Sequence, residues 1–72
     1  MKRSQGTASN TQVLLQAVSK QFADNDGMPW TPREDVILMR STDLFAVAIE
    51  LERTFSAVRD RYRTLRRNGY IA

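Results

Sequence analysis

Residues 53–72 hold the side chains of this sequence that are best suited to bind a polyanion. This segment contains six arginines and one aspartate, a local charge of +5, whereas residues 21–52 contain two arginines and seven acidic residues, a local charge of −5. Arginine carries a planar fork of donors that matches phosphate groups and guanine edges. An arginine-rich helix can also be only a solvated surface, so the charge by itself does not decide between these interpretations.

The apolar residues of the same segment predict which of its charged side chains face outward. Val58, Tyr62 and Leu65 recur at helical spacing, which predicts a helix over about 55–67 with these three side chains in the core. Because an α-helix fits the major groove of B-DNA, side chains on the opposite face of this helix can reach base edges. We expect base contacts from Arg59, Asp60 and Arg63, and phosphate contacts from Arg53, Ser56, Arg66 and Arg67.

Two side chains of this predicted helix have a second interpretation each. Asp60 can accept a hydrogen bond from a cytosine amine, or it can form a local salt bridge that orients Arg59 or Arg63. Phe55 can be a hydrophobic staple across the corner before the helix, which we favour, or it can contact a thymine methyl group.

A second helix is predicted over about 32–40 by the strongest local signal in the chain. Thr31 is a good N-cap, and Pro32 stands at the first helical position, where its missing N–H does no harm. Glu34, three residues after the cap, completes a capping box with Thr31.

The remaining C-terminal signals predict a short helix and the ends of its neighbours. Asp43 is the expected N-cap of a helix over about 44–52, and Thr54 is the expected N-cap of the last helix. Asn68-Gly69 should end that last helix, with Tyr70-Ile71 folding back on it. Because no stretch alternates apolar and polar residues between hairpin turns, the predicted fold class is all-α.

The N-terminal region is expected to begin with a polar arm. Residues 1–9 carry Lys2 and Arg3 and have the composition of a flexible basic arm. A chain of 72 residues is too short for two cores, so residues 10–72 are predicted to form a single helical DNA-binding domain.

A further helix is predicted over about 9–23, with Ser9 as its N-cap. Leu14, Val18 and Phe22 recur every four residues, and Leu15 widens the apolar stripe that they form, which needs cover. The favoured partner of this stripe is the rest of the domain, and the alternative is a dimer contact.

Two segments share their order and spacing of residues with one DNA-binding family. The first is Trp30-Thr31-Pro32-Arg33-Glu34-Asp35-Val36-Ile37-Leu38. The second is Val47-Ala48-x-x-Leu51-x-Arg53-Thr54-x-x-Ala57-Val58-x-x-Arg61-Tyr62-x-x-Leu65. Together, over about 29–67, they resemble a Myb/SANT-like helix-turn-helix DNA-binding domain of the small prokaryotic or phage type.

This resemblance implies a three-helix Myb-like helix-turn-helix bundle, to which this chain adds an N-terminal helix. Leu44 and Tyr62 stand where the family has its second and third tryptophans, and both keep a large core side chain. The resemblance also implies that Arg61 pairs with Glu34 or Asp35. By the same resemblance, the positions at which the family reads DNA bases correspond to Arg59, Asp60 and Arg63.

The composition excludes several kinds of chemistry. The sequence contains no cysteine and no histidine, which excludes a disulfide framework, a Cys/His zinc site and a nucleophile activated by histidine. Its neighbouring carboxylates do not converge on one point of a helix, and Asp24-Asn25-Asp26-Gly27 lacks the later ligands of a calcium loop. We therefore expect no enzyme activity, no metal and no cofactor.

The predicted function is sequence-preferring binding of double-stranded DNA, by a transcriptional regulator or an accessory DNA-organising factor. One helix makes few contacts, so tight binding would need a second copy of the chain (a homodimer), a minor-groove contact from the arm that carries Lys2 and Arg3, or a protein partner. The alternative is a protein-interaction module whose arginine-rich helix docks on an acidic protein partner. No apolar run is long enough to span a bilayer, so we expect no membrane partner and a cytoplasmic, nucleoid-associated location, or the host cytoplasm for a phage protein.

Overall fold

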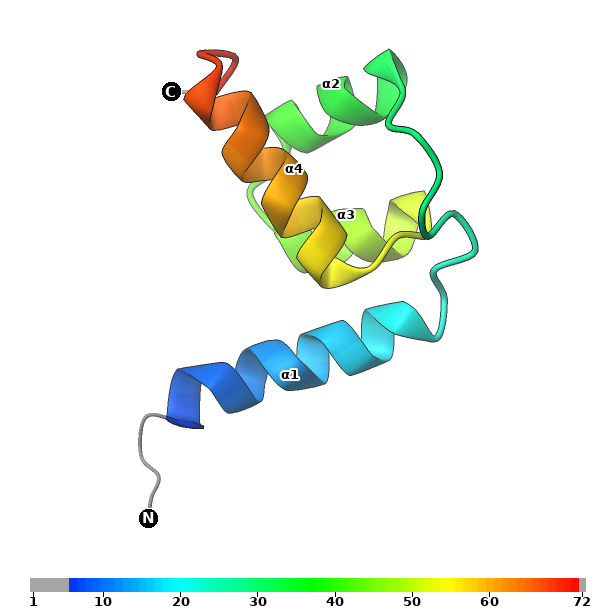
Figure 1. Ribbon diagram of the computed structural model, residues 1–72, viewed down its shortest axis with the longest axis vertical. Helices are drawn as coiled ribbons and strands as arrows, with labels where there is room; N and C mark the ends of the chain where they lie inside the picture. The colour runs from blue at the N-terminus through cyan, green and yellow to red at the C-terminus, as the bar shows by residue number, and fades with distance from the viewer. Residues whose placement is uncertain (1–5, 72) are drawn as a thin grey trace.

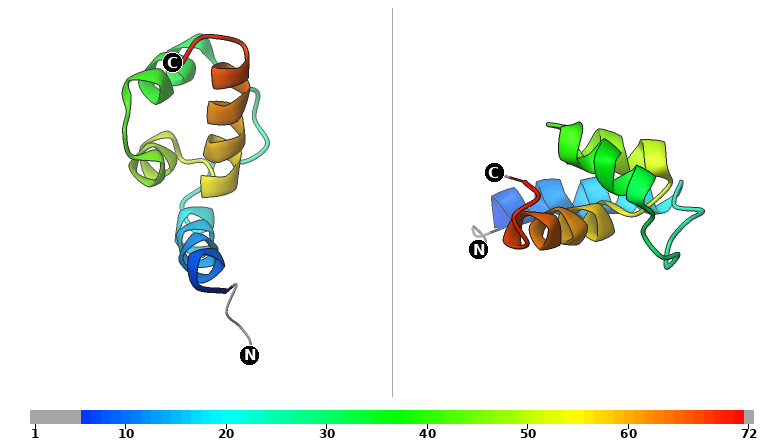
Figure 2. Two further views of the ribbon diagram at one scale, coloured as in Figure 1. Left: turned by 90° about the vertical axis from the view of Figure 1, so that its left-hand side faces the viewer. Right: turned by 90° about the horizontal axis from the view of Figure 1, so that it is seen from above.

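The computed structural model describes residues 6–71, and the regular structure in this part of the chain is entirely helical (Figure 1). This confirms the all-α class. Helices α2, α3 and α4 pack into one group, and α1 lies along one end of that group, in contact with α3 and α4 (Figures 1 and 2). The four helices are α1 (Gly6–Lys20), α2 (Pro32–Arg40), α3 (Leu44–Leu51) and α4 (Phe55–Arg67).

The N-terminal ends of α2, α3 and α4 confirm the capping residues predicted from the sequence. The Thr31 hydroxyl accepts the backbone N–H of Glu34 at 3.2 Å, and the Glu34 carboxylate accepts the backbone N–H of Thr31 at 3.0 Å. Pro32 occupies the first position of α2. Asp43 caps α3 and Thr54 caps α4 through their side-chain oxygens. Each cap satisfies backbone donors that have no partner within the helix.

A corner of three residues joins α3 to α4. Helix α3 ends at Leu51, one residue earlier than predicted, because Glu52 adopts the left-handed conformation with φ of 56°. This turn lets the backbone N–H of Arg53 donate to the Ala48 carbonyl oxygen at 2.9 Å. The left-handed conformation is unfavourable for a residue with a side chain, but here it closes α3 and starts α4 without a longer loop.

The hydrophobic core lies between α2, α3 and α4, and each of these helices contributes to it. Trp30, Leu44 and Tyr62 are partly buried and pack against this core, so the large side chains expected at the last two positions are in place. The buried residues of the core are Leu38, Val47, Ala48, Leu51, Val58 and Leu65. Phe55 is also buried, in agreement with the favoured staple interpretation.

The end of α4 also follows the sequence prediction. Asn68 is its C-cap, and Gly69 has φ of 87°, a conformation that glycine adopts without a steric cost. The chain then turns back, and the backbone N–H of Tyr70 donates to the Leu65 carbonyl oxygen at 2.9 Å. Ile71 packs against the core, whereas Tyr70 is exposed.

Helix α1 is displaced along the sequence from its predicted position. It begins at Gly6 and ends at Lys20, so Ser9 is not its N-cap and residues 6–9 belong to the helix instead of the predicted arm. No proline or other strong helix breaker separates Gly6 from Ser9, and the helix therefore continues toward the N-terminus. Residues 1–5, the rest of that arm, lie outside the described residues.

The favoured packing of the α1 stripe on the domain is wrong. Leu14, Val18 and Phe22 are all exposed. Helix α1 instead turns toward the other helices a side on which Ser19 is fully buried and Leu15 and Gln16 are half-buried. This side contacts α3 and α4 and is hydrogen-bonded to α4, and residues 6–71 leave Leu14, Val18 and Phe22 exposed.

Candidate nucleic-acid interface

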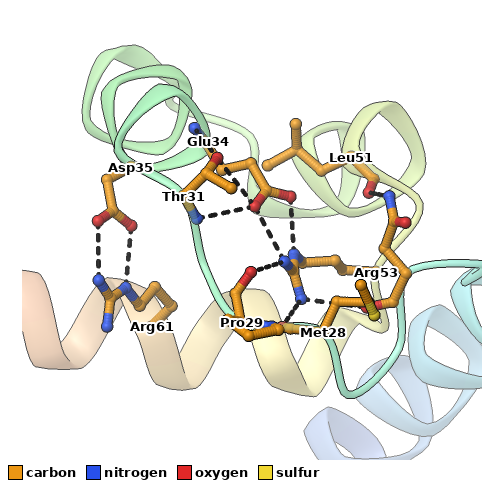
Figure 3. A network of polar contacts seen from close by, with 9 residues as sticks. Met28, Pro29, Thr31, Glu34, Asp35, Leu51, Arg53 and Arg61 are labelled. Atoms are coloured by element: carbon orange, nitrogen blue, oxygen red, sulfur yellow. Dashed lines mark hydrogen bonds and ion pairs between the residues drawn. The ribbon is translucent and has the colours of Figure 1, made fainter.

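Arg53 is buried at the corner between α3 and α4, with only 3% of its surface exposed. Its guanidinium has five N–H groups, and each of them has an acceptor (Figure 3). Nε and Nη2 donate to the two carboxylate oxygens of Glu34 at 2.8 and 2.9 Å. The other three N–H groups donate to carbonyl oxygens in the loop before α2, those of Asn25 (3.2 Å), Met28 (2.8 Å) and Pro29 (2.9 Å).

The predicted phosphate contact of Arg53 does not fit this geometry, since the guanidinium is neither exposed nor free to donate. Arg53 instead holds the loop before α2 and the first turn of α2 against the corner, and it lies 4.3 Å from the centre of the Trp30 ring. Sequence reasoning missed this structural role. No local pattern distinguishes Arg53 from the arginines that follow it, and Glu34 already had a role in the capping box.

The bond from Arg53 controls the ionisation of Glu34. It is the main cause that lowers the pKa of this carboxyl group from 4.5 to about 2, with a smaller contribution from the backbone N–H of Thr31. Burial opposes the shift because it disfavours the charged form. Glu34 therefore serves the α2 cap and the Arg53 pair at the same time, and its carboxylate stays charged under mildly acidic conditions.

Arg61 is a second arginine whose donors are used inside the molecule. Its Nε and Nη2 donate to the two carboxylate oxygens of Asp35 at 2.9 and 2.7 Å, which raises the pKa of Arg61 (Figure 3). This confirms the pairing of Arg61 with an acidic residue of α2. Such a two-bond pair fixes the orientation of both groups, so α4 is tied to α2 along its middle.

Other arginines of α4 lie on its outer face, opposite Val58 and Leu65. Arg63 is 65% exposed, and Arg66 and Arg67 are also exposed. Asp60 lies beside Arg63, and their side chains form a pair of 3.6 Å between Oδ1 and Nη1. The pair is long and both side chains are largely exposed to water, so the local salt bridge expected for Asp60 is present but leaves both groups free to contact another molecule.

The N-terminal end of the same outer face is partly covered by α1. Nη1 of Arg59 donates to the side-chain oxygen of Gln12 at 2.5 Å, and the guanidinium lies 5.9 Å from the centre of the Phe55 ring. The backbone N–H of Ser56 donates to the side-chain oxygen of Gln16 at 2.8 Å. Arg59 and Ser56 are half-buried. The Arg59 side chain already donates to α1, unlike those of Arg63, Arg66 and Arg67.

A hollow between α1 and α4 extends this basic surface. Lys20 and Arg59 both line it, together with the apolar side chains of Val13, Ala17 and Phe55, and none of the residues that line it is acidic. The positive charge of the outer face thus continues from α4 toward α1.

A part of the surface that α4 does not reach has a different character. A hollow there is lined by Arg33 of α2, by Glu50 of α3 and by Glu52, the C-cap of α3, and by no residue of α4. A polyanion would meet carboxylates there, so the two surfaces differ in their suitability for nucleic acid.

Among residues 6–71, no group of three or more acidic, histidine or cysteine side chains is arranged to hold a metal ion. Within the same residues, none of the helices combines the length and the apolar composition that crossing a membrane requires. Comparison with protein-family models, with curated proteins and with solved structures finds no match to this chain.

Proposed function

We propose that this chain binds double-stranded DNA with the outer face of α4 in the major groove, as a transcriptional regulator or an accessory DNA-organising factor. Two short helices joined by a three-residue corner, the second rich in arginine, have the plan of a helix-turn-helix. The resemblance of residues 29–67 to Myb/SANT-like domains supports the same arrangement of α2, α3 and α4.

The observation that carries this proposal is the division of the arginines of the corner and of α4 between the interior of the molecule and its outer face. Arg53 and Arg61 are neutralised by carboxylates of α2, whereas Arg63, Arg66 and Arg67 point outward with at most one long surface pair. The inward pairs hold α4 in place, and the outward groups carry the charge that a phosphate backbone attracts.

Within this interface the individual side chains are assigned different roles. Arg63 and Asp60 occupy the middle of the exposed face and are the proposed base-reading pair. Arg66 and Arg67, near the end of α4, are proposed to contact phosphates. Arg59 joins the base-reading group if its bond to Gln12 opens. Ser56, at the start of α4, is proposed to contact a phosphate.

The test is the fluorescence anisotropy of labelled duplexes, selected from a random pool, at several salt concentrations. We expect the affinity to fall as salt rises, because binding releases counterions. Arg63→Ala should weaken binding to the selected sequence by roughly 5- to 150-fold, the equivalent of about 1–3 kcal/mol, and should change the preferred base. Arg67→Ala should weaken binding to all sequences alike.

Arg33→Ala is the matched control, since it removes the same charge from the side that α4 does not reach. If Arg33→Ala weakens binding as much as Arg63→Ala, the interface is not on α4. If the protein ignores duplexes at low salt but binds an acidic protein partner, the arginines of α4 serve protein interaction instead.

A further inference from the structure

Three large apolar side chains at the N-terminal end of the molecule form an exposed stripe, which we define as Leu14, Val18 and Phe22. Their exposed fractions are 66%, 41% and 53%. The stripe continues past the end of α1, because the backbone N–H of Phe22 donates to the Ser19 carbonyl oxygen at 3.0 Å and keeps the chain turning. Burying such side chains away from water is favourable, so a stripe of this kind marks a contact surface.

The contacts of α1 with the rest of the chain leave this stripe free to face another molecule. Gln12, Gln16 and Ser19 make the hydrogen bonds to α4, and at ~100° per residue they lie between about 100° and about 160° around the helix from Val18. In Figures 1 and 2, α1 projects beyond the group of α2, α3 and α4, so a second helix can approach it from the outer side.

The chemistry of the stripe selects the kind of partner. Lys20 is the only charged residue between Gly6 and Ala23, and it lines the hollow toward α4. The stripe offers an acidic partner no cation to bind. Helix α1 also lacks the Lys- and Arg-rich polar face by which amphipathic helices bind anionic lipid headgroups. The partner that fits is an uncharged apolar helix, and this chain presents one itself.

We propose that the stripe is a self-association surface on which α1 of one molecule packs against α1 of a second copy. The three residues are spaced by four and form a ridge along the helix. When such ridges of two helices interdigitate, the helices cross at about −50°. A two-fold axis beside Val18 places the smallest of the three side chains where the helices are closest, and it sets Leu14 of each copy against Phe22 of the other. No like charges meet in this arrangement.

The size of the stripe sets the strength of the contact. Three partly exposed side chains from each copy form a small interface relative to the roughly 1,200–2,000 Å² of a stable complex. The association is therefore reversible and rises with protein concentration. It does not depend on nucleic acid, so its test is independent of the proposed DNA binding.

Disulfide trapping tests this inference in the full chain, because the protein contains no cysteine. We compare Val18→Cys with Val13→Cys, a matched valine on the same helix that is more exposed (64% against 41%) but lies about 140° around it. Random collision favours the more exposed thiol. Pairing through the stripe instead makes Val18→Cys form dimers faster, by about tenfold or more, because the two thiols are held together.

Circular dichroism first establishes that both cysteine variants are folded, which we expect because neither valine belongs to the core. Adding Phe22→Gln to Val18→Cys should then remove the rate advantage, since it destroys the apolar contact without touching the thiol. Equal rates for the two cysteine variants, or a faster rate for Val13→Cys, would overturn the proposal. An advantage that survives Phe22→Gln would equally contradict pairing through this stripe.

Discussion

The corner that holds Arg53 and the outer face that carries Arg63 use the same residue type for opposite purposes. Arg53 has five internal acceptors and 3% exposure, whereas Arg63 has one carboxylate at 3.6 Å and is 65% exposed. The two residues are ten positions apart in the same arginine-rich segment of the sequence. Whether an arginine stabilises the fold or stays available for binding is thus determined by the hydrogen-bond acceptors that the fold places near its guanidinium, and not by the residue type or its charge.

This difference has an energetic consequence. A buried charged group that loses its partner destabilises the fold, because it stays shielded from water without a compensating bond. An exposed charged group that loses its partner is solvated by water instead. Stability should therefore depend strongly on the Arg53 corner and little on the outer face, and any binding of nucleic acid should show the reverse dependence.

The largest loss of stability, and so the strongest test of this difference between the corner and the outer face, is expected from Arg53→Met. It leaves the Glu34 carboxylate and three carbonyl oxygens without their donor, and we expect the free energy of unfolding to fall by about 3–5 kcal/mol. The measurement is urea unfolding followed by circular dichroism. The matched variant Arg63→Met should change stability by no more than about 0.5 kcal/mol. An Arg53→Met protein as stable as Arg63→Met would remove the distinction between the two groups.

A somewhat smaller effect is expected from acid. The pKa of Glu34 is about 2 in the folded protein and ordinarily 4.5, so its contribution to stability is complete above 4.5 and is lost as the pH falls toward 2. A shift of this size corresponds to about 3 kcal/mol. We expect urea midpoints measured between pH 6 and pH 2 to fall more for the native chain than for Glu34→Gln, which has already lost the contribution. The same pH dependence in both proteins would show that the Arg53–Glu34 bond adds no stability.

The sequence was sufficient to predict the features that depend on nearby residues. The caps Thr31, Asp43 and Thr54 and the bounds of α2 and α4 follow from side chains within three or four positions of the helix end. The inward positions of Val58 and Leu65 follow from helical spacing in the same way. These interactions join residues that are close in the sequence, so they can be predicted from the sequence alone.

The features that the sequence did not predict join distant parts of the chain. The acceptors of Arg53 lie 19–28 positions away, and no spacing rule connects them to the corner. Likewise, Gln12 and Gln16 reach Arg59 and Ser56 across 40 or more positions. In α1 the apolar stripe suggested one packing side, but polar side chains that satisfy the backbone N–H groups at the start of α4 determine which side faces the domain.

The most direct test of the comparison is a nuclear magnetic resonance titration of the arginine Nε–Hε signals with a duplex at low salt. We expect the signals of Arg63, Arg66 and Arg67 to shift or broaden as duplex is added, because these groups meet phosphates and base edges. The signals of Arg53 and Arg61 should stay in place, since their donors remain bonded to Glu34 and Asp35. Shifts confined to Arg53 and Arg61, or signals of the outer arginines that do not respond at any duplex concentration, would contradict the assignment of the outer face of α4 to DNA.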